Sequence, residues 1–509
     1  MHRHADIAIV GAGSGGIGAA LAAARMGRRV LLIERAPSIG GTVVRAGVST
    51  WEPVAGATGI TFDIYRRLRE LRDAVALYSY GRHVAWQRPD DPFPGGEQVI
   101  DPSLSYLDTL QRHGMRSLHE DAAWARATLH GVVFEPDAYA QTVGEILAEA
   151  GVEVLTGVAV ADAEARDGRV QRIRLSDGSE VRARAFIDCT GDGALCAACG
   201  CEMMAGRDAR GRFGEPHAPD GASPATNAAT LIYRILPTDE ERIEPLPDGV
   251  PVECWWRERF PAVSAVQAPR GGYIVNMLPT IEWREIAALG GGLHEECRRR
   301  VLAHWHHVQR EFPEFRRYRL AWIAPEVGRR EEQRVVGECV LTEHDLLAGL
   351  SGQGHPDIIA IADHAMDVHG EGGGCRELSE PYGIPLRCLI PRGTRNLLVA
   401  SRAASFSSIA ASSCRLSRTM MQLGQAAGTA AGLALAEGCG VRDLAPDDVR
   451  EALRARRVQL EWPLGHEVRE WMVRASDDER QRRTGETPVP RGGLSPAARA
   501  GRRSRSSPA

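Results

Sequence analysis

The chain has 509 residues, of which 43% are hydrophobic and 25% are charged, and its formal net charge is -4. This length exceeds one ordinary domain, so we expect two interwoven domains. The near-neutral charge gives no argument for a nucleic acid or a membrane as a partner. The sequence contains no lysine, which excludes a Schiff-base lysine, a pyridoxal-phosphate attachment site and a Walker-type phosphate-binding lysine.

The N-terminal residues show no pattern of a signal or transit peptide, and no later run reaches about 18 apolar residues. The eleven cysteines are scattered along the chain. Reduced thiols are the simplest interpretation of that scatter. We therefore expect a cytoplasmic protein.

A glycine-rich turn stands between a strand and a helix near the start of the chain. An apolar run at residues 7–10 is followed by the turn at 11–16 and then by an Ala/Leu-rich segment. A second apolar run at 30–33 ends in Glu34. This order of strand, turn, helix, strand and acid predicts a dinucleotide-binding unit.

Each glycine of that unit has a physical role. Gly11 permits the tight turn, Gly13 lets the backbone approach a pyrophosphate, and Gly16 lets the helix lie close to the strand. The phosphates would then meet the positive end of the helix. Glu34 is predicted to accept hydrogen bonds from the adenosine ribose.

The residues after Glu34 narrow the choice of cofactor. Arg35 follows directly, and Gly40, Gly41 and Thr42 come shortly after. An acid–Arg pair followed by Gly-Gly-Thr resembles the FAD-binding flavoproteins rather than simple NAD dehydrogenases. In those flavoproteins the Gly-Gly segment lies along the FAD phosphates and ribityl chain.

A second block at residues 131–195 continues the same pattern. A helix is predicted from Pro136 and a strand at 152–155, and in similar flavoproteins the residues just after this strand, here Val158, reach the adenine. Turn signals at 167–168 and 177–178 predict a small antiparallel meander. The block closes with a buried strand and Thr190, Gly191 and Asp192, which resemble the second cofactor-contacting turn of this fold.

The later part of the sequence is predicted to form an inserted region, followed by segments that belong again to the first domain. An amphipathic helix is predicted at 293–312 and a buried strand at 396–400. Ser412 and Ser413 are predicted to cap a long helix that runs to Glu437. Gly424, Gly428 and Gly432 are predicted to form a small-residue face on that helix, suited to close packing of one backbone on another.

Together these motifs resemble the FAD-dependent oxidoreductase family that includes the heterodisulfide reductase-like flavoproteins. The chain is more distantly similar to fumarate reductase and succinate dehydrogenase flavoproteins. The resemblance spans roughly residues 5–455, with two departures: Ser401 stands where the family often has glycine, and Gln333 stands where it has arginine. The segments that carry it are 11–16, 34–35, 40–42, 187–193, 327–337, 396–402 and 424–428.

The resemblance implies an α/β fold, with a Rossmann-like FAD-binding domain of the glutathione-reductase type and an inserted α+β substrate or cap domain. The expected FAD-binding residues are Gly11, Gly13, Gly16, Glu34, Arg35, Gly40, Gly41, Thr42, Val158, Thr190, Gly191, Asp192, Arg402 and Ser413. The expected domain ranges are 1–202 for the first part of the FAD-binding domain, 203–385 for the inserted domain, 386–455 for the last part, 456–479 for a C-terminal helical extension and 480–509 for a disordered tail.

Two segments of the inserted region offer catalytic groups. Arg330 and Arg334 suit a substrate carboxylate, because guanidinium groups bind carboxylates through two hydrogen bonds. The alternative is a structural Arg–Glu ion-pair network. Asp367 and His369 suit proton transfer that accompanies hydride transfer at the flavin. An ordinary loop histidine is the alternative here. No CxxC accompanies this cluster, so we predict no metal site, although His364, Asp367 and His369 leave one conceivable.

Three cysteines follow the second cofactor turn, at Cys196, Cys199 and Cys201. They leave three interpretations open: buried structural thiols, a redox pair or an iron–sulfur site. A cluster usually needs four thiolates in a characteristic run, which is absent, so structural thiols are favoured.

We therefore predict an FAD-dependent oxidoreductase that moves hydride between the flavin and a small organic, anionic substrate. The alternative is an electron-transfer flavoprotein that works as one component with an iron–sulfur partner. A flavin-dependent tRNA-modifying enzyme is disfavoured by the absence of a basic patch. No second glycine-rich unit predicts an NAD(P)H domain, so the electron acceptor stays open among a quinone, a protein carrier, oxygen and the substrate itself.

Overall fold

The computed structural model describes residues 2–81, 96–114, 122–256, 262–370 and 372–484. The chain divides into two compact units, Met1–Gly465 and His466–Ala509. In the second unit the structure describes one helix, α14 (His466–Thr484), so the predicted tail 480–509 begins inside this helix. The remainder of that tail, 485–509, lies outside the described residues.

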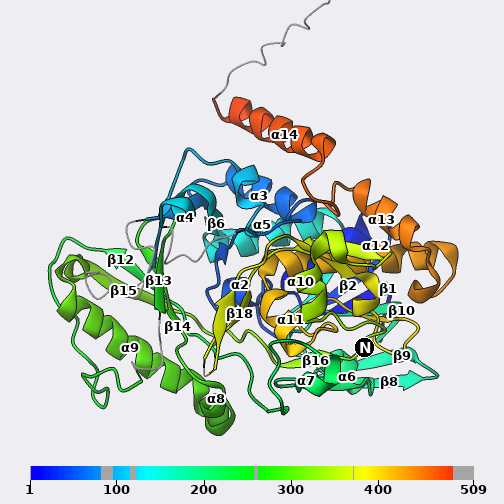
Figure 1. The fold of residues 1–509 in the computed structure, drawn as a ribbon, viewed down its shortest axis with the longest axis horizontal. Helices are drawn as coiled ribbons and strands as arrows, with labels where there is room; N and C mark the ends of the chain where they lie inside the picture. The colour runs from blue at the N-terminus through cyan, green and yellow to red at the C-terminus, as the bar shows by residue number, and fades with distance from the viewer. Residues whose placement is uncertain (1, 82–95, 115–121, 257–261, 371, 485–509) are drawn as a thin grey trace, which may run out of the picture. The chain divides into compact units, whose positions relative to one another are not determined.

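A mainly parallel sheet forms the centre of the first domain (Figure 1). Its parallel strands, in spatial order, are β7 (Glu153–Leu155), β2 (Val30–Ile33), β1 (His2–Val10), β10 (Glu180–Asp188) and β21 (Leu397–Val399). Strand β2 is buried at all four positions, as expected for a parallel sheet covered on both faces. The predicted α/β fold with a Rossmann-like domain is confirmed.

The predicted meander is also present. Strands β8 (Val160–Arg166) and β9 (Arg169–Leu175) pair antiparallel with each other, and β9 pairs antiparallel with β10. Asp167 and Gly168 both have positive φ, at 52° and 74°, in the turn between β8 and β9. The Asp-Gly signal therefore marks a hairpin turn that needs this backbone region.

Two helices pack closely across the first domain, α1 (Ser14–Ala24) and α12 (Ser417–Glu437). A Cβ added at Gly424 would lie 1.9 Å from the Gly15 carbonyl oxygen, and one at Gly428 would lie 2.3 Å from that of Ala19. Only glycine permits this approach. The predicted small-residue face is confirmed.

The predicted start of the long helix is wrong. Ser412 and Ser413 end a separate short helix, α11 (Ser408–Ser413), whose N-cap is Ser407. The helix stops because Cys414 leaves helical geometry, at φ -85° and ψ 58°, and α12 begins only at Ser417. A serine pair is a strong capping signal, but sequence alone does not say which turn it caps.

A second sheet of eight strands builds the other half of the first unit, and α9 (Leu293–Glu311) lies along it (Figure 1). Leu293, Cys297, Val301 and Trp305 of α9 are buried in one core cluster with side chains of this sheet, as the amphipathic pattern predicts. In spatial order the strands are β15 (Tyr318–Ile323), β12 (Tyr233–Pro237), β14 (Tyr273–Leu278), β13 (Ala262–Gln267), β5 (Gly96–Ile100), β4 (Val75–Tyr80), β6 (Gly131–Phe134) and β3 (Thr50–Trp51).

This sheet takes strands from both sides of residue 202. Strands β3 to β6 precede that position and β12 to β15 follow it, and β5 pairs parallel with β13. The predicted boundary between 1–202 and 203–385 therefore does not separate the two sheets. Residues 456–465 belong to the first compact unit rather than to the C-terminal helix.

The remaining α-helices and strands complete the fold. The other helices are α2 (Thr42–Arg45), α3 (Ile60–Glu70), α4 (Ala122–Thr128), α5 (Pro136–Glu149), α6 (Ala194–Ala198), α7 (Arg210–Phe213), α8 (Trp283–Leu289), α10 (Glu343–Gly352) and α13 (Pro446–Arg454). The other strands are β11 (Met203–Ala205), β16 (Gln333–Val335), β17 (Ile358–Ala362), β18 (Met366–Val368), β19 (Gly374–Arg376) and β20 (Tyr382–Pro385). Across the described residues, none of the helices has the length and apolar character needed to cross a membrane.

Candidate functional site

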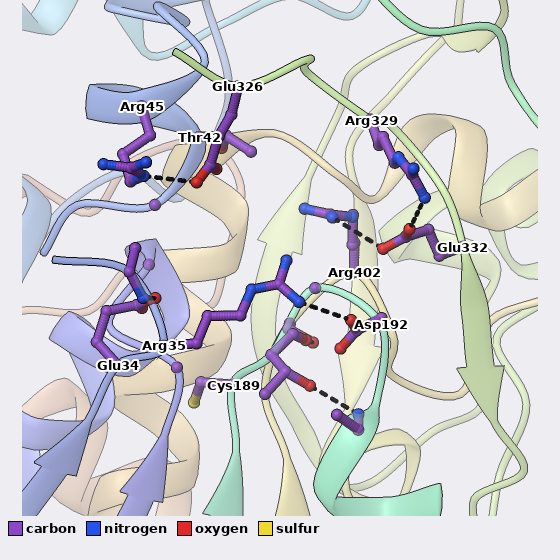
Figure 2. A pocket seen from close by; sticks show the side chains of 18 of the residues that line it. Glu34, Arg35, Thr42, Arg45, Cys189, Asp192, Glu326, Arg329, Glu332 and Arg402 are labelled. Carbon is purple, nitrogen blue, oxygen red and sulfur yellow. Dashed lines mark hydrogen bonds and ion pairs between the residues drawn. The ribbon is translucent and has the colours of Figure 1, made fainter. Parts of the chain in front are cut away.

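A cavity of about 730 Å³ opens beyond the carboxyl ends of β1, β2 and β10 (Figure 2). This is the edge of an open α/β sheet where ligands bind, and the volume suits a small-molecule site. Eleven of the predicted FAD-binding residues line it: Gly11, Gly13, Glu34, Arg35, Gly41, Thr42, Val158, Thr190, Gly191, Asp192 and Arg402.

The glycine-rich turn leaves open space where the motif predicts a pyrophosphate. Gly13 is the N-cap of α1, and a Cβ added there would meet only the Gly41 Cα, at 3.9 Å. A Cβ on Gly11, by contrast, would lie 2.5 Å from the Cys189 carbonyl oxygen. Gly13 therefore keeps a ligand-facing space open, and Gly11 permits a tight backbone contact.

Three of the predicted cofactor residues lie away from the cavity lining. Gly16 packs α1 against the turn, since its Cβ would lie 1.8 Å from the Gly11 oxygen. Gly40 has φ 105° and donates its N–H to the Ala12 oxygen at 2.8 Å. Ser413 is fully buried and donates its hydroxyl to the His364 carbonyl at 2.5 Å. Gly16 and Gly40 shape the turn, and Ser413 is held within the protein.

Glu34 orders the glycine-rich turn in this structure. Its Oε2 accepts the Ala12 N–H at 2.7 Å and its Oε1 accepts the Ala36 N–H at 2.8 Å. A carboxylate has about four acceptor positions, so the two oxygens can each accept one more hydrogen bond. The predicted contact of Glu34 with the ribose stays a prediction that this geometry permits.

Ion pairs surround the middle of the cavity. Figure 2 shows Arg35 reaching Asp192, at 3.3 Å, and Arg402 reaching Glu332, at 3.6 Å. Figure 2 also shows Arg45 of α2 paired with Glu326, at 2.6 Å. The pair of Arg35 with Asp192 joins the segments that follow β2 and β10, whereas the pairs of Arg402 and Arg45 reach the segment that leads into β16.

Arg402 is a partly buried cation with charged side chains of both signs around it. Burial lowers the pKa of Arg402, Glu332 and Asp192 raise it in part, and the charges of Arg35 and Arg329 lower it further. The Arg402 Nε and the Asp192 Oδ1 are buried without a hydrogen-bond partner among the described residues. The unpartnered Arg402 N–H can donate to a phosphate oxygen, and the unpartnered Asp192 oxygen can accept from a hydroxyl group, so the site fits a dinucleotide.

The family model for FAD dependent oxidoreductases matches residues 6–453. The chain belongs to this family. It is accordingly an FAD-dependent enzyme, and the open space above Gly13 together with the unpartnered groups of Asp192 and Arg402 fits the cofactor. The finer likeness to the heterodisulfide reductase flavoproteins stays a prediction.

Solved structures resemble this chain at low identity. A geranylgeranyl bacteriochlorophyll reductase-like protein from Thermoplasma acidophilum is 12% identical with a TM-score of 0.44, over 94% of this chain and 97% of that chain. A flavoprotein/dehydrogenase from Cytophaga hutchinsonii is 14% identical with a TM-score of 0.41, over 95% and 86%. The myxobacterial chondrochloren halogenase is 12% identical with a TM-score of 0.42, over 89% and 79%. No curated protein matches the sequence.

A second group of charged residues meets the cavity at Arg415. Arg415 lines the cavity and donates from Nη2 to the Asp367 Oδ2 at 2.8 Å. The same carboxylate oxygen lies 2.6 Å from the His369 Nε2. The Arg330 Nη1 donates to the Ala228 carbonyl at 2.8 Å and to the Thr230 hydroxyl at 3.0 Å. We call Arg330, Asp367, His369 and Arg415 the catalytic cluster, after the predicted role of Arg330, Asp367 and His369; that role stays a prediction.

The pKa values of the residues in the catalytic cluster are shifted by burial and by the charges of their neighbours. Burial and the positive charges of Arg330 and Arg415 lower the pKa of His369 to about 4, although Asp367 acts in the opposite direction. Burial raises the pKa of Asp367, but His369 and Arg415 outweigh this and hold it well below its usual range. Burial and the charge of Arg415 lower the pKa of Arg330 to about 9. At neutral pH the cluster thus pairs a neutral imidazole with an ionised carboxylate.

Arg334, the fourth predicted catalytic residue, lies apart from this cluster. Its side chain is fully buried and pairs with Glu331 and with the Asp208 Oδ2, the latter at 3.0 Å. It also donates to the carbonyls of Gly206 and Phe406, at 2.9 and 3.0 Å. This arrangement matches the structural ion-pair network that the sequence left as the alternative.

The sequence reasoning missed Arg415 and Glu52. Arg415 follows the serine pair closely, but nothing in its spacing linked it to Asp367. The Glu52 Oε2 lies 3.1 Å from the Arg112 Nη1 and 3.2 Å from the His364 Nε2. Burial raises the pKa of Glu52, but His364, Arg112 and Arg415 together bring it to about 2. No sequence signal marked this glutamate.

Two further predictions concern metals and thiols. Within the described ranges no group of three or more His, Cys, Asp or Glu side chains could hold a metal ion. Cys196 is fully buried on α6, whereas Cys199 and Cys201 are partly buried.

Proposed function

We propose that this enzyme transfers hydride between FAD and a small anionic organic substrate that binds at the catalytic cluster. The observation that carries the proposal is the neutral imidazole of His369, held by Asp367 beside an arginine that lines the cofactor cavity. FAD supplies a hydride acceptor or donor when bound. The residues of this chain supply binding, orientation and a proton path.

Arg330 is the proposed binding group for the anion. Its Nη1 hydrogen bonds go to neutral acceptors, a carbonyl and a hydroxyl. Burial and the charge of Arg415 oppose its own charge, as the direction of its pKa shift indicates. A substrate carboxylate would offset the unfavourable effects of burial and of the Arg415 charge on the Arg330 guanidinium. It could also accept two parallel hydrogen bonds from that group.

His369 is the proposed acid–base group. Its Nε2 faces Asp367, and its backbone N–H donates to the Asn227 Oδ1 at 2.8 Å, so both ring and backbone are held in place. A carboxylate on one ring nitrogen fixes the tautomer and leaves the other nitrogen to exchange a proton. In oxidation of the substrate the imidazole would take the proton, and in reduction it would return it.

Replacing Arg330 with alanine is expected to weaken substrate binding. Loss of charge-assisted hydrogen bonds of about 1.5–3 kcal/mol should raise KM about 10- to 100-fold, with a smaller effect on kcat. The measurement is steady-state kinetics with a substrate found by anaerobic screening for flavin bleaching. Arg330→Lys should recover part of the binding, and Arg310→Ala at the exposed end of α9 serves as the control. An unchanged KM in Arg330→Ala would contradict the assignment.

The pH dependence follows from the lowered pKa of His369. An imidazole with pKa about 4 is neutral above that pH and becomes protonated as the pH falls through it. If His369 acts as the base, kcat/KM for substrate oxidation should stay level near pH 6.5 and fall only as the pH approaches about 4. Because Arg330 lowers this pKa, Arg330→Gln should move the acidic limb upward. A limb that stays in place in this variant would argue against His369 as its source.

The test of the function itself is anaerobic mixing of the holoenzyme with panels of small carboxylates and other organic anions. Bleaching of the bound flavin by a small molecule supports the proposal. A flavin that bleaches only through a stable complex with an iron–sulfur protein would favour the electron-transfer alternative instead.

A further inference from the structure

The cavity at the glycine-rich turn has a second wall that comes from outside the nucleotide-binding unit. Two stretches of the chain contribute to it, the start of α9 and the segment between β15 and β16. The nucleotide-binding unit at residues 7–34 contributes none of these groups. We call the following six lining residues the second wall: Gly290, Gly291, Leu293, His294, Glu326 and Glu332.

Two ion pairs connect the second wall to arginines that line the same cavity (Figure 2). The Arg45 Nε lies 2.6 Å from the Glu326 Oε1, and the Glu326 N–H donates to the Arg45 carbonyl at 3.0 Å. The Arg402 Nη2 lies 3.6 Å from the Glu332 Oε2. Arg45 ends α2, which begins directly after the predicted phosphate-binding Gly41. The second wall is therefore held to the part of the first domain that is expected to contact the FAD phosphates.

His294 offers the cavity a hydrogen-bonding atom. Its Nε2 lies 2.8 Å from the Ala324 carbonyl oxygen. Because a carbonyl oxygen only accepts, this nitrogen carries the hydrogen, and the Nδ1 of the neutral ring is an acceptor. Among the residues that the structure describes, none is hydrogen-bonded to this Nδ1. The hydroxyl and amino groups of FAD can donate to such an atom.

We propose that the second wall retains bound FAD, with the Arg45–Glu326 pair holding it in place and His294 as a further FAD-binding residue. A dinucleotide in this cavity lies against the glycine-rich turn and the second wall, since both line the same space. Release of FAD then requires Glu326 to separate from Arg45. The inference concerns the cofactor and does not depend on the proposed substrate or on the catalytic cluster.

The decisive variant is Glu326→Gln, for which two effects have opposite signs. Removal of a carboxylate near a bound pyrophosphate reduces repulsion, so charge alone would slow the release of FAD. Loss of the ion pair with Arg45 would instead speed it. The Glu326 side chain is 45% exposed, so we expect the modest effect of a solvent-screened pair, about two- to fivefold faster dissociation. The rise of free-flavin fluorescence after dilution of the holoenzyme measures this rate.

A second pair of variants tests His294. In His294→Gln the amide N–H can still donate to the Ala324 carbonyl, but the acceptor at the ring Nδ1 is lost. One neutral hydrogen bond corresponds to about two- to tenfold faster FAD dissociation. His294→Ala loses both interactions and should release FAD faster than His294→Gln.

The control is Glu311→Gln, which removes an exposed carboxylate at the far end of α9 and should release FAD at the native rate. Circular dichroism checks that each variant is folded. Hydrogen exchange on the native enzyme tests the proposal without a variant: peptides that cover 290–294 and 324–332 should exchange more slowly with FAD than without it. Native or slower release in Glu326→Gln, or exchange in these peptides that ignores FAD, would overturn the retaining wall. A native rate in His294→Gln would exclude His294 from the FAD site.

Discussion

A Gly13→Val variant is expected to fold and to contain no FAD. Gly13 has φ -78°, so valine meets no backbone strain there, and its Cβ would contact only the Gly41 Cα, at 3.9 Å. The isopropyl group would instead occupy the space that opens onto the N-terminus of α1, where the dinucleotide pyrophosphate is expected. We expect visible flavin absorbance per protein to fall to background while the circular dichroism spectrum is retained.

A matched control comes from another glycine. Gly211 lies outside the cavity with no atom within 4 Å of an added Cβ and without positive φ, so Gly211→Val makes the same change in open space. This variant should remain yellow. A Gly13→Val protein that retains a full complement of FAD would show that the cofactor does not lie on the glycine-rich turn.

The second large effect is expected for His369→Gln, which should slow flavin reduction by about 10²–10⁴-fold. Glutamine keeps a polar side chain of similar reach beside Asp367, but it cannot take up the proton that accompanies hydride transfer. FAD content should not change, because His369 does not line the cofactor cavity. The measurement is rapid mixing of oxidised enzyme with substrate under anaerobic conditions.

Two further variants test this interpretation. His344→Gln changes an exposed histidine of α10 and should reduce at the native rate. Asp367→Asn should also slow reduction, since Asp367 fixes the tautomer of the imidazole through the 2.6 Å contact. A near-native rate in His369→Gln would show that the proton moves elsewhere, and an equal loss in His344→Gln would point to a general defect.

Much of the first domain could be predicted because its signals are local. The turn at residues 11–16 needs glycine for reasons of backbone conformation and close approach, so the same signal is visible in any fold that contains it. The hairpin at Asp167 and Gly168 is likewise a property of two residues. The helix α9 shows its buried stripe through its own periodicity, whatever it packs on.

Only part of the catalytic cluster could be predicted from the sequence. Asp367 and His369 stand two residues apart, so their pairing was visible in the sequence. Arg415 reaches them from the end of α11, and Arg330 from the segment before β16. Arg334 looked equivalent to Arg330 on spacing alone. In the structure Arg334 is buried and paired with Asp208, whereas Arg330 donates to the Ala228 carbonyl. Charge and burial at these positions depend on neighbours from distant parts of the chain.

The sequence by itself determined the nucleotide-binding unit and the α/β class, since both follow from glycines, strands and an acid at short range. The choice of FAD came from the resemblance of residues 34–42 to the flavoproteins. Only the tertiary structure decided that residues 50–134 and 233–323 share one sheet, because strand pairing joins segments that carry no mutual signal. It also decided that Arg415 lines the cofactor cavity and that Arg334 is buried in an ion-pair network. Ionisation is set by burial and by charges brought close through folding, and neither can be read from a linear spacing.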